Sequence, residues 1–141
     1  MANARYFSGF RTFTVVSVAG LSACVAVLAA QNRNPKTLKN PVPATAASIE
    51  DGKAVFERMC AKCHGDEGKG DGPQAPEGSH PANLTDNVWV HGSTDGEIFT
   101  TIHDGVPPKY DMDSYEGKIS DTDIWNVVNY IRSIGPKNSR R

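Results

Sequence analysis

The sequence has too few cysteines for a disulfide scaffold, and three cysteines in 141 residues cannot all pair. It also lacks a net basic charge, since 15 Lys and Arg stand against 16 Asp and Glu, which argues against a nucleic-acid binder. Residues 1–47 hold five basic residues and no acidic one, so residues 48–141 hold ten basic and all 16 acidic residues, a net charge of −6. The chain is therefore a basic leader joined to an acidic domain of roughly 90 residues, a size that usually needs a staple to stabilise its modest core.

Residues 13–30 contain no charged side chain and read FTVVSVAGLSACVAVLAA. A helix of this length spans about 27 Å, just enough for a hydrocarbon core of about 30 Å. We therefore expect residues 1–30 to be a retained N-terminal membrane anchor. Two alternatives stay open. One is a cleaved secretory signal, and the other is a lipoprotein signal acylated at Cys24, because Leu21-Ser22-Ala23-Cys24 resembles a bacterial lipobox.

Residues 31–47 contain three prolines and lack both aromatic side chains and helical periodicity. This composition predicts an extended, partly polyproline linker that lets a domain move near a membrane without escaping. At the other end of the chain, residues 137–141 form a short basic tail. The folded domain is thus expected at residues 48–136.

The strongest motif is C-x-x-C-H, formed by Cys60, Cys63 and His64. Two cysteines at this spacing lie on one side of a helical turn, where their thiols can add to the two vinyl groups of one porphyrin and the next imidazole points at the iron. A thioredoxin-like pair would need a preceding strand, and a four-ligand zinc site would need a second Cys/His pair. The flanks here are helix and glycine-rich loop, so the motif predicts one covalently bound haem c, which is the staple that the domain needs.

Three segments have the caps and the apolar spacing of helices. Each begins with a serine or threonine followed three residues later by a carboxylate; the pairs are Ser48/Asp51, Thr94/Glu97 and Ser120/Asp123. Gly135-Pro136 ends the last helix. No stretch alternates as a strand does, so the domain is expected to be nearly all helix.

These features resemble a class I, single-haem bacterial cytochrome c domain across residues 48–136. The matching landmarks lie, in chain order, at Gly52–Phe56, Cys60–Gly65, Pro81–Asp86, Ile102–Gly105 and Asp123–Ser133. The resemblance implies a small all-α cytochrome c fold wrapped around one covalent haem, here preceded by a single N-terminal transmembrane helix. It also implies a close crossing of the first and last helices, with Gly52 against Tyr130.

The resemblance implies that His64 is one axial iron ligand and that a methionine in the loop before the last helix is the other. Met112 holds that place, whereas Met59 directly precedes the motif on the proximal side. Met/His ligation suits electron transfer. Asp113 stands where the family usually has proline, so an exposed, non-ligating Met112 stays open as an alternative. A distal histidine, His103 or His91, is the other alternative.

Further residues are candidates for the surroundings of the haem. The resemblance implies that Pro81 or its neighbour accepts a hydrogen bond from the second ring nitrogen of His64. Trp89, Tyr110 and Tyr115 are candidates for lining the haem or bonding its propionates, and equally for ordinary core packing.

The expected function is that of a membrane-tethered electron carrier, not an enzyme, that passes single electrons between membrane redox complexes of a respiratory or photosynthetic chain. Candidate partners are a quinol-oxidising complex, a terminal oxidase, a dehydrogenase or a photosynthetic reaction centre, each with a basic docking patch for the acidic domain. The resemblance implies the bacterial cytoplasmic membrane, with the haem domain on the periplasmic side. Two alternatives stay open: a haem sensor or peroxidase-like domain with an open distal site, and a fixed cytochrome subunit of a larger oxidoreductase or reaction-centre complex.

Overall fold

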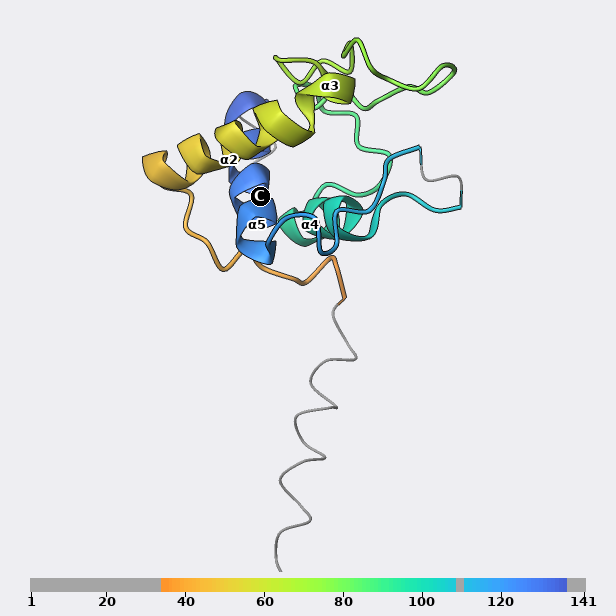
Figure 1. The fold of residues 1–141 in the computed structure, drawn as a ribbon. Helices are drawn as coiled ribbons and strands as arrows, with labels where there is room; N and C mark the ends of the chain where they lie inside the picture. Colours follow the sequence, from red (N-terminus) through yellow and green to blue (C-terminus); the bar gives the residue numbers. More distant parts are fainter. Residues whose placement is uncertain (1–33, 109–110, 137–141) are drawn as a thin grey trace, which may run out of the picture. The chain divides into compact units, whose positions relative to one another are not determined.

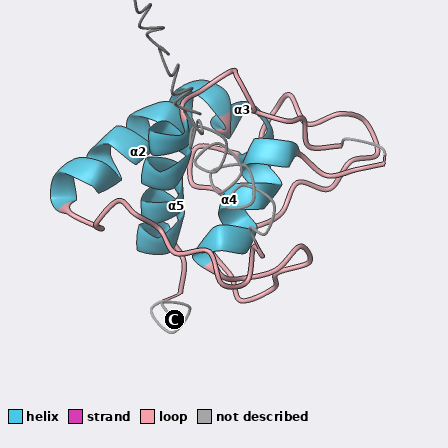
Figure 2. Ribbon diagram, turned by 90° about the horizontal axis from the view of Figure 1, so that it is seen from below, coloured by secondary structure: helices cyan, strands magenta, loops and turns pink. Residues whose placement is uncertain are grey.

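Four helices make up the regular structure of the described residues, 34–108 and 111–136, in the computed structural model (Figures 1 and 2). They are α2 (Ala46–Met59), α3 (Ala61–His64), α4 (Asp95–Asp104) and α5 (Asp121–Ile134), and these ranges contain no strand. The predicted all-α class is confirmed for this part of the chain. The chain divides into two compact units, Met1–Asn32 and Arg33–Arg141, and every described residue belongs to the second.

The predicted membrane anchor at residues 1–30 and the basic tail at 137–141 lie outside the described residues. Among the residues that are described, none of the helices has the length and apolar character needed to cross a membrane.

The helix caps largely follow the sequence prediction. Thr94 and Glu97 form a complete capping box at the start of α4, and Ser120 caps α5 by accepting a hydrogen bond from the Asp123 N–H. The predicted cap of the first helix is wrong. Thr45 is the N-cap of α2, and its hydroxyl accepts a hydrogen bond from the Ser48 N–H, so the helix begins earlier than expected.

Ser48 instead lies buried between two helices. Its hydroxyl donates to the Asn126 side-chain oxygen at 2.8 Å and accepts from the Asn129 side-chain nitrogen at 2.7 Å. Buried polar groups must be hydrogen-bonded to avoid a desolvation cost, and here three side chains satisfy one another across the α2–α5 contact. This tertiary role explains why a residue with the pattern of a cap is not one.

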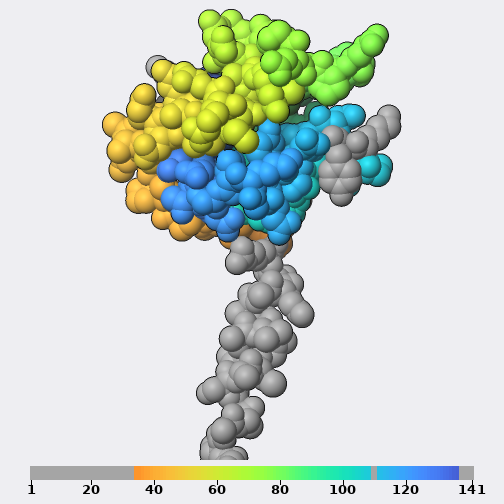
Figure 3. Space-filling view, viewed as in Figure 1, coloured from red at the N-terminus to blue at the C-terminus, as the bar shows by residue number. Residues whose placement is uncertain are grey.

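α2 and α5 cross closely, and they lie side by side on one face of the molecule (Figure 3). Gly52 allows this approach, because a Cβ atom at that position would collide with the Asn126 carbonyl. The α5 atoms nearest to Gly52 belong to Asn126 and Val127, so the main chain of α5, and not the predicted Tyr130 ring, makes the closest approach to this glycine. Tyr130 lies one turn further along α5, where its ring packs against Phe56 with the centroids 5.2 Å apart.

The core joins α2, α4 and α5. Phe56, Ile124, Val127 and Val128 are fully buried, and the Phe99 ring of α4 stacks on Trp125 of α5 with the centroids 4.1 Å apart. This frame holds the two segments that matter for the site: the turn where α2 ends and α3 begins, and the loop between α4 and α5.

Residues 34–45 pack against the domain and do not form the free linker expected there. The Asn40 side-chain nitrogen donates to the Trp125 carbonyl at 3.2 Å and to the Asn129 side-chain oxygen at 2.9 Å. Leu38 is partly buried against the core and leaves no room for a Cβ atom at Gly96. The domain therefore begins before residue 46, and this part of the chain is a strap over α4 and α5.

Candidate haem-binding site

The motif begins at Cys60, where α2 ends, and its other residues form the short helix α3. The Cys60 N–H closes α2 by donating to the Phe56 carbonyl at 2.8 Å, and the Cys60 carbonyl accepts from the N–H groups of Cys63 and His64 at 3.1 and 2.9 Å. Cys60 is thus both the C-cap of α2 and the N-cap of α3. The helical turn holds both cysteines and the histidine in the local arrangement that the motif requires.

The His64 ring is oriented by a backbone carbonyl. Its Nδ1 lies 3.0 Å from the Ala82 oxygen, and because a carbonyl only accepts, Nδ1 carries the proton and Nε2 keeps a lone pair for a metal. Burial lowers the pKa of His64, against the opposing effect of the Ala82 hydrogen bond, so the neutral, metal-binding form is favoured. The partner is the neighbour of Pro81 and not Pro81 itself, whose carbonyl lies against Gly70.

The loop after His64 is fastened to the motif turn by backbone hydrogen bonds. The bonds run from Gly70 to the His64 carbonyl at 2.7 Å, from Gly72 to Cys63 at 3.1 Å and from Gln74 to Lys62 at 2.8 Å. Leu84 then donates to the Gly68 carbonyl at 2.7 Å, which brings the Ala82 carbonyl back to the histidine. The proximal side of the site is therefore specified mainly by main-chain contacts.

The loop between α4 and α5 carries Met112. Met112 is partly buried against the core, and its carbonyl accepts from the Val106 N–H at 3.0 Å. Gly105 begins the loop with φ at 75°, and a Cβ atom there would lie 2.8 Å from the Met112 oxygen and 2.7 Å from the Ser114 nitrogen. The Ser114 hydroxyl donates to the His103 carbonyl at 2.7 Å. The loop is thus folded back on the end of α4.

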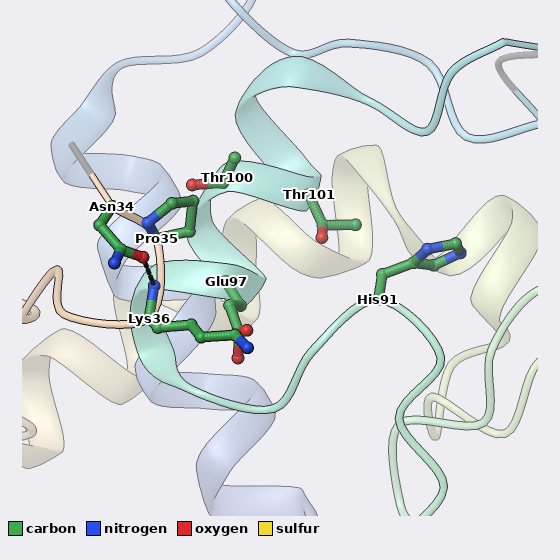
Figure 4. A pocket seen from close by; sticks show the side chains of 7 residues that line it. All are labelled: Asn34, Pro35, Lys36, His91, Glu97, Thr100 and Thr101. Atoms are coloured by element: carbon green, nitrogen blue, oxygen red, sulfur yellow. Dashed lines mark hydrogen bonds between the residues drawn. The ribbon is translucent and has the colours of Figure 1, made fainter. Parts of the chain in front are cut away.

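The two histidine alternatives have other surroundings. His103 has Nδ1 2.5 Å from the Asp104 carboxylate and Nε2 3.8 Å from that of Asp121, and its ring stacks on Phe99. His91 is exposed and lines a surface pocket of about 270 Å³ (Figure 4). The other residues of that pocket come from the strap and α4: Asn34, Pro35, Lys36, Glu97, Thr100 and Thr101. The His103 ring is thus engaged by two carboxylates and an aromatic ring, whereas His91 lies at the surface.

Tyr115 and Cys60 are both shielded from water next to the turn. The Tyr115 hydroxyl donates to the Met59 carbonyl at 2.9 Å. Burial raises the pKa of Tyr115 to about 12, with smaller effects from the neighbouring cysteines. Burial also raises the pKa of the Cys60 thiol to about 12, against the opposing charge of Lys62. Tyr110 lies outside the described residues.

Trp89 carries a buried polar group that bears on whether a haem fits the site. Its Nε1 is buried and has no hydrogen-bond partner within the described part of the chain. The Arg132 guanidinium lies 5.6 Å from the centre of its ring, and Arg132 Nε donates to Asp95 at 2.7 Å. A buried N–H without an acceptor calls for an explanation, and a haem propionate could be that acceptor. The residues present therefore fit the group that the motif predicts.

An acidic groove of about 510 Å³ adjoins the motif turn. Four carboxylates line it, together with one lysine and three small or apolar residues: Glu57, Asp66, Glu67, Asp71, Lys62, Ala61, Gly65 and Pro73. Part of the negative charge expected from the composition therefore lies beside the site. Among the described residues, no group of three or more His, Cys, Asp and Glu side chains gathers as a metal site.

Comparison with known proteins identifies relatives of this domain. Residues 47–131 match the family described as cytochrome C oxidase, cbb3-type, subunit III. The cbb3-type cytochrome c oxidase subunit FixP of Bradyrhizobium sp. is 36% identical over 84 residues, which are 60% of this chain and 27% of that protein. The subunit CcoP of Rhodobacter capsulatus is 35% identical over 98 residues, which are 66% of this chain and 31% of that protein.

Two solved structures share the fold. A chain of the reducing HAO-like protein complex of Kuenenia stuttgartiensis is 27% identical, with a TM-score of 0.60 over 70% of this chain and 50% of its own. Cytochrome cL of Methylophaga aminisulfidivorans is 21% identical, with a TM-score of 0.55 over 68% of this chain and 63% of its own. The chain spans only about a third or less of the curated relatives that it matches, 27% and 31% for the two above. Because the family model matches residues 47–131, the folded part of the chain is a cytochrome c domain, which implies a covalent c-type haem. The chain belongs to the cbb3-type cytochrome c oxidase subunit III family.

Proposed function

We propose that this chain is an electron-transfer subunit fixed in a terminal oxidase complex of the cbb3 type, where it carries one haem c. The observation that carries the proposal is the His64–Ala82 hydrogen bond of 3.0 Å, which orients an imidazole directly after two cysteines in a chain of this family. The sequence contains one C-x-x-C-H motif, which supports a single haem in this chain.

Each residue of the site has a defined task in this proposal. Cys60 and Cys63 would hold the haem by thioether bonds, and His64, through Nε2, and Met112 would be the iron ligands. The Ala82 carbonyl fixes the orientation and raises the basicity of the His64 ring. When bound, the haem supplies a one-electron Fe(II)/Fe(III) couple.

The named relatives favour a fixed subunit over the free carrier that the sequence first suggested, because they are subunits of an oxidase. They also favour a terminal oxidase over a quinol-oxidising complex, a dehydrogenase or a photosynthetic reaction centre as the partner. The acidic groove beside the motif supports docking on a basic surface of that partner.

We further propose that residues 1–30 anchor the chain in the bacterial cytoplasmic membrane, with the haem domain on the periplasmic side. The uncharged stretch at residues 13–30 supports an anchor, and the cleaved and lipid-modified forms remain outcomes of the test.

Gentle solubilisation of membranes that contain the full chain, followed by purification and intact mass, tests this function. We expect the haem-bearing chain to co-purify with oxidase subunits in a fixed ratio and to have the mass of the full chain plus one haem. Recovery of the haem protein alone, at every detergent strength, would contradict the fixed subunit and restore the free carrier. A mass that begins at Cys24 with added lipid would replace the anchor by a lipoprotein.

A further inference from the structure

Tyr115 joins the two sides of the site. Its hydroxyl donates a hydrogen bond of 2.9 Å to the Met59 carbonyl. Met59 is the last residue of α2 and directly precedes Cys60, whereas Tyr115 lies three residues after Met112 in the loop between α4 and α5. One side chain therefore connects the distal loop to the backbone that carries the first attachment cysteine.

The main chain of Tyr115 is fixed independently of this bond. Its N–H points to the carbonyls of Ile102 and His103 at the end of α4, each 3.2 Å away, and its own carbonyl accepts from Lys118 at 3.0 Å. The ring packs against the core, and the Lys118 ammonium lies 5.4 Å from its centre. The Tyr115 main chain is held by α4 and its hydroxyl by Met59. The length of this side chain therefore sets the separation between the distal loop and the end of α2.

Among the described residues, the other hydrogen bonds of the loop run within the loop or to the end of α4. Val106 bonds the Met112 carbonyl, and Ser114 bonds the His103 carbonyl. These bonds shape the loop, but they do not determine how far it lies from Cys60. That separation decides whether the Met112 sulfur can reach the iron of a haem that Cys60 and Cys63 hold.

We propose that Tyr115 is a positioning residue that holds the Met112 loop at a set distance from the haem-attachment turn. The inference rests on the proposed role of Met112 as an iron ligand. Without the hydroxyl, the loop keeps its anchor on α4 but loses its tie to α2. Met112 then leaves the iron more readily, and an external ligand takes its place.

Imidazole binding to the oxidised holoprotein tests this role, because imidazole must displace the distal ligand. We expect Tyr115→Phe to retain its covalent haem and to bind imidazole about 2- to 10-fold more tightly than the wild type, as loss of one ordinary hydrogen bond predicts. The matched control is Tyr130→Phe, which also removes a tyrosine hydroxyl but has its ring against Phe56 in the α2–α5 contact. The control should keep the wild-type affinity.

An unchanged imidazole affinity in Tyr115→Phe overturns the inference, and so does an equal increase in Tyr130→Phe, which would show general loosening of the domain. The role of Met112 fails by a different result. If Met112→Leu keeps the weak red-edge absorbance band of methionine–Fe(III) ligation, Met112 is not the ligand, and the positioning role of Tyr115 falls with it.

Discussion

The two sides of the haem site are built in different ways. On the proximal side, Cys60, Cys63 and His64 lie on one helical turn, and main-chain hydrogen bonds hold the following loop against it. On the proposed distal side, main-chain and side-chain hydrogen bonds hold the Met112 loop to the end of α4, and a single side-chain hydrogen bond, from Tyr115 to the Met59 carbonyl, ties it to the motif turn. The proximal side is thus specified by main-chain geometry close in sequence, whereas the distance between the Met112 loop and the motif turn depends on one side chain. Substitutions on the two sides should differ accordingly.

The largest effect is expected from the proximal cysteines. Replacing both Cys60 and Cys63 by serine removes every thioether that the motif can form, so no haem should stay with the chain in a denaturing gel stained for haem. Cys24→Ser is the matched control, because Cys24 lies outside the motif and its loss should leave the haem stain unchanged. Haem that stays covalent in the double variant would contradict the attachment site.

A distal change of the main chain should have the next largest effect. Gly105→Ala puts a side chain at φ 75° and ψ −172°, a conformation almost restricted to glycine, and against the Met112 carbonyl, whereas Gly117→Ala has a positive φ of 71° with nothing within 4 Å. Each variant should lose about 1–2 kcal/mol of unfolding free energy from the backbone alone, and Gly105→Ala should lose more. Only Gly105→Ala should also weaken the methionine–Fe(III) band, as absorbance spectra and denaturant titrations of both holoproteins will show. If the two variants have the same stability and the same band intensity, the backbone at Gly105 does not position Met112.

Trp89→Phe removes the buried N–H that lacks a partner among the described residues. If that group donates to a haem propionate, the variant should lose about 1.5–3 kcal/mol of holoprotein stability, the usual range for a bond to a charged acceptor. The reduction potential should also fall, because the N–H no longer offsets the propionate charge and Fe(III) becomes relatively more stable. Redox titration separates this from simple packing loss: a lower stability with an unchanged potential would mean that Trp89 only fills space.

The smallest effect concerns alkaline pH. Burial raises the pKa of Tyr115 from 10.0 to about 12. As the pH rises above 10, the unfolded chain therefore releases this proton before the folded chain does, and the folded state loses stability until the pH passes about 12. Tyr115→Phe should flatten the decline of unfolding free energy between pH 10 and 12 in denaturant titrations. An identical decline in wild type and variant would mean that Tyr115 does not titrate differently in the two states.

Local features were predictable from the sequence. The capping box of Thr94 and Glu97 and the cap at Ser120 appear as predicted, because a cap depends on residues within one turn. The motif turn likewise follows from five consecutive residues. Ser48 shows the limit of this reasoning: it has the pattern of a cap, but its hydroxyl pairs with Asn126, which lies 78 residues away in sequence.

Features that depend on distant contacts were not predictable. Asn40 bonds groups on Trp125 and Asn129, which lie 85 and 89 residues away, and nothing in a proline-containing segment indicates such partners. The resemblance implies that Pro81 or its neighbour accepts the His64 hydrogen bond. Which of the two carbonyls does so depends on how the loop from Gly65 to Leu84 folds back, and in the structure it is that of Ala82. The sequence also does not show that the Trp89 N–H is buried without a hydrogen-bond partner among the described residues, because burial depends on the whole fold.

The central claim is that Met112 completes an iron site whose other half is the Cys60–His64 turn. The absorbance spectrum of the oxidised protein, recorded for the wild type and for Met112→Leu, tests it most directly. We predict that the wild type shows the weak red-edge band of methionine–Fe(III) ligation and that Met112→Leu loses this band while its haem remains covalently bound. A wild-type protein without the band, or a variant that keeps it, would contradict the account.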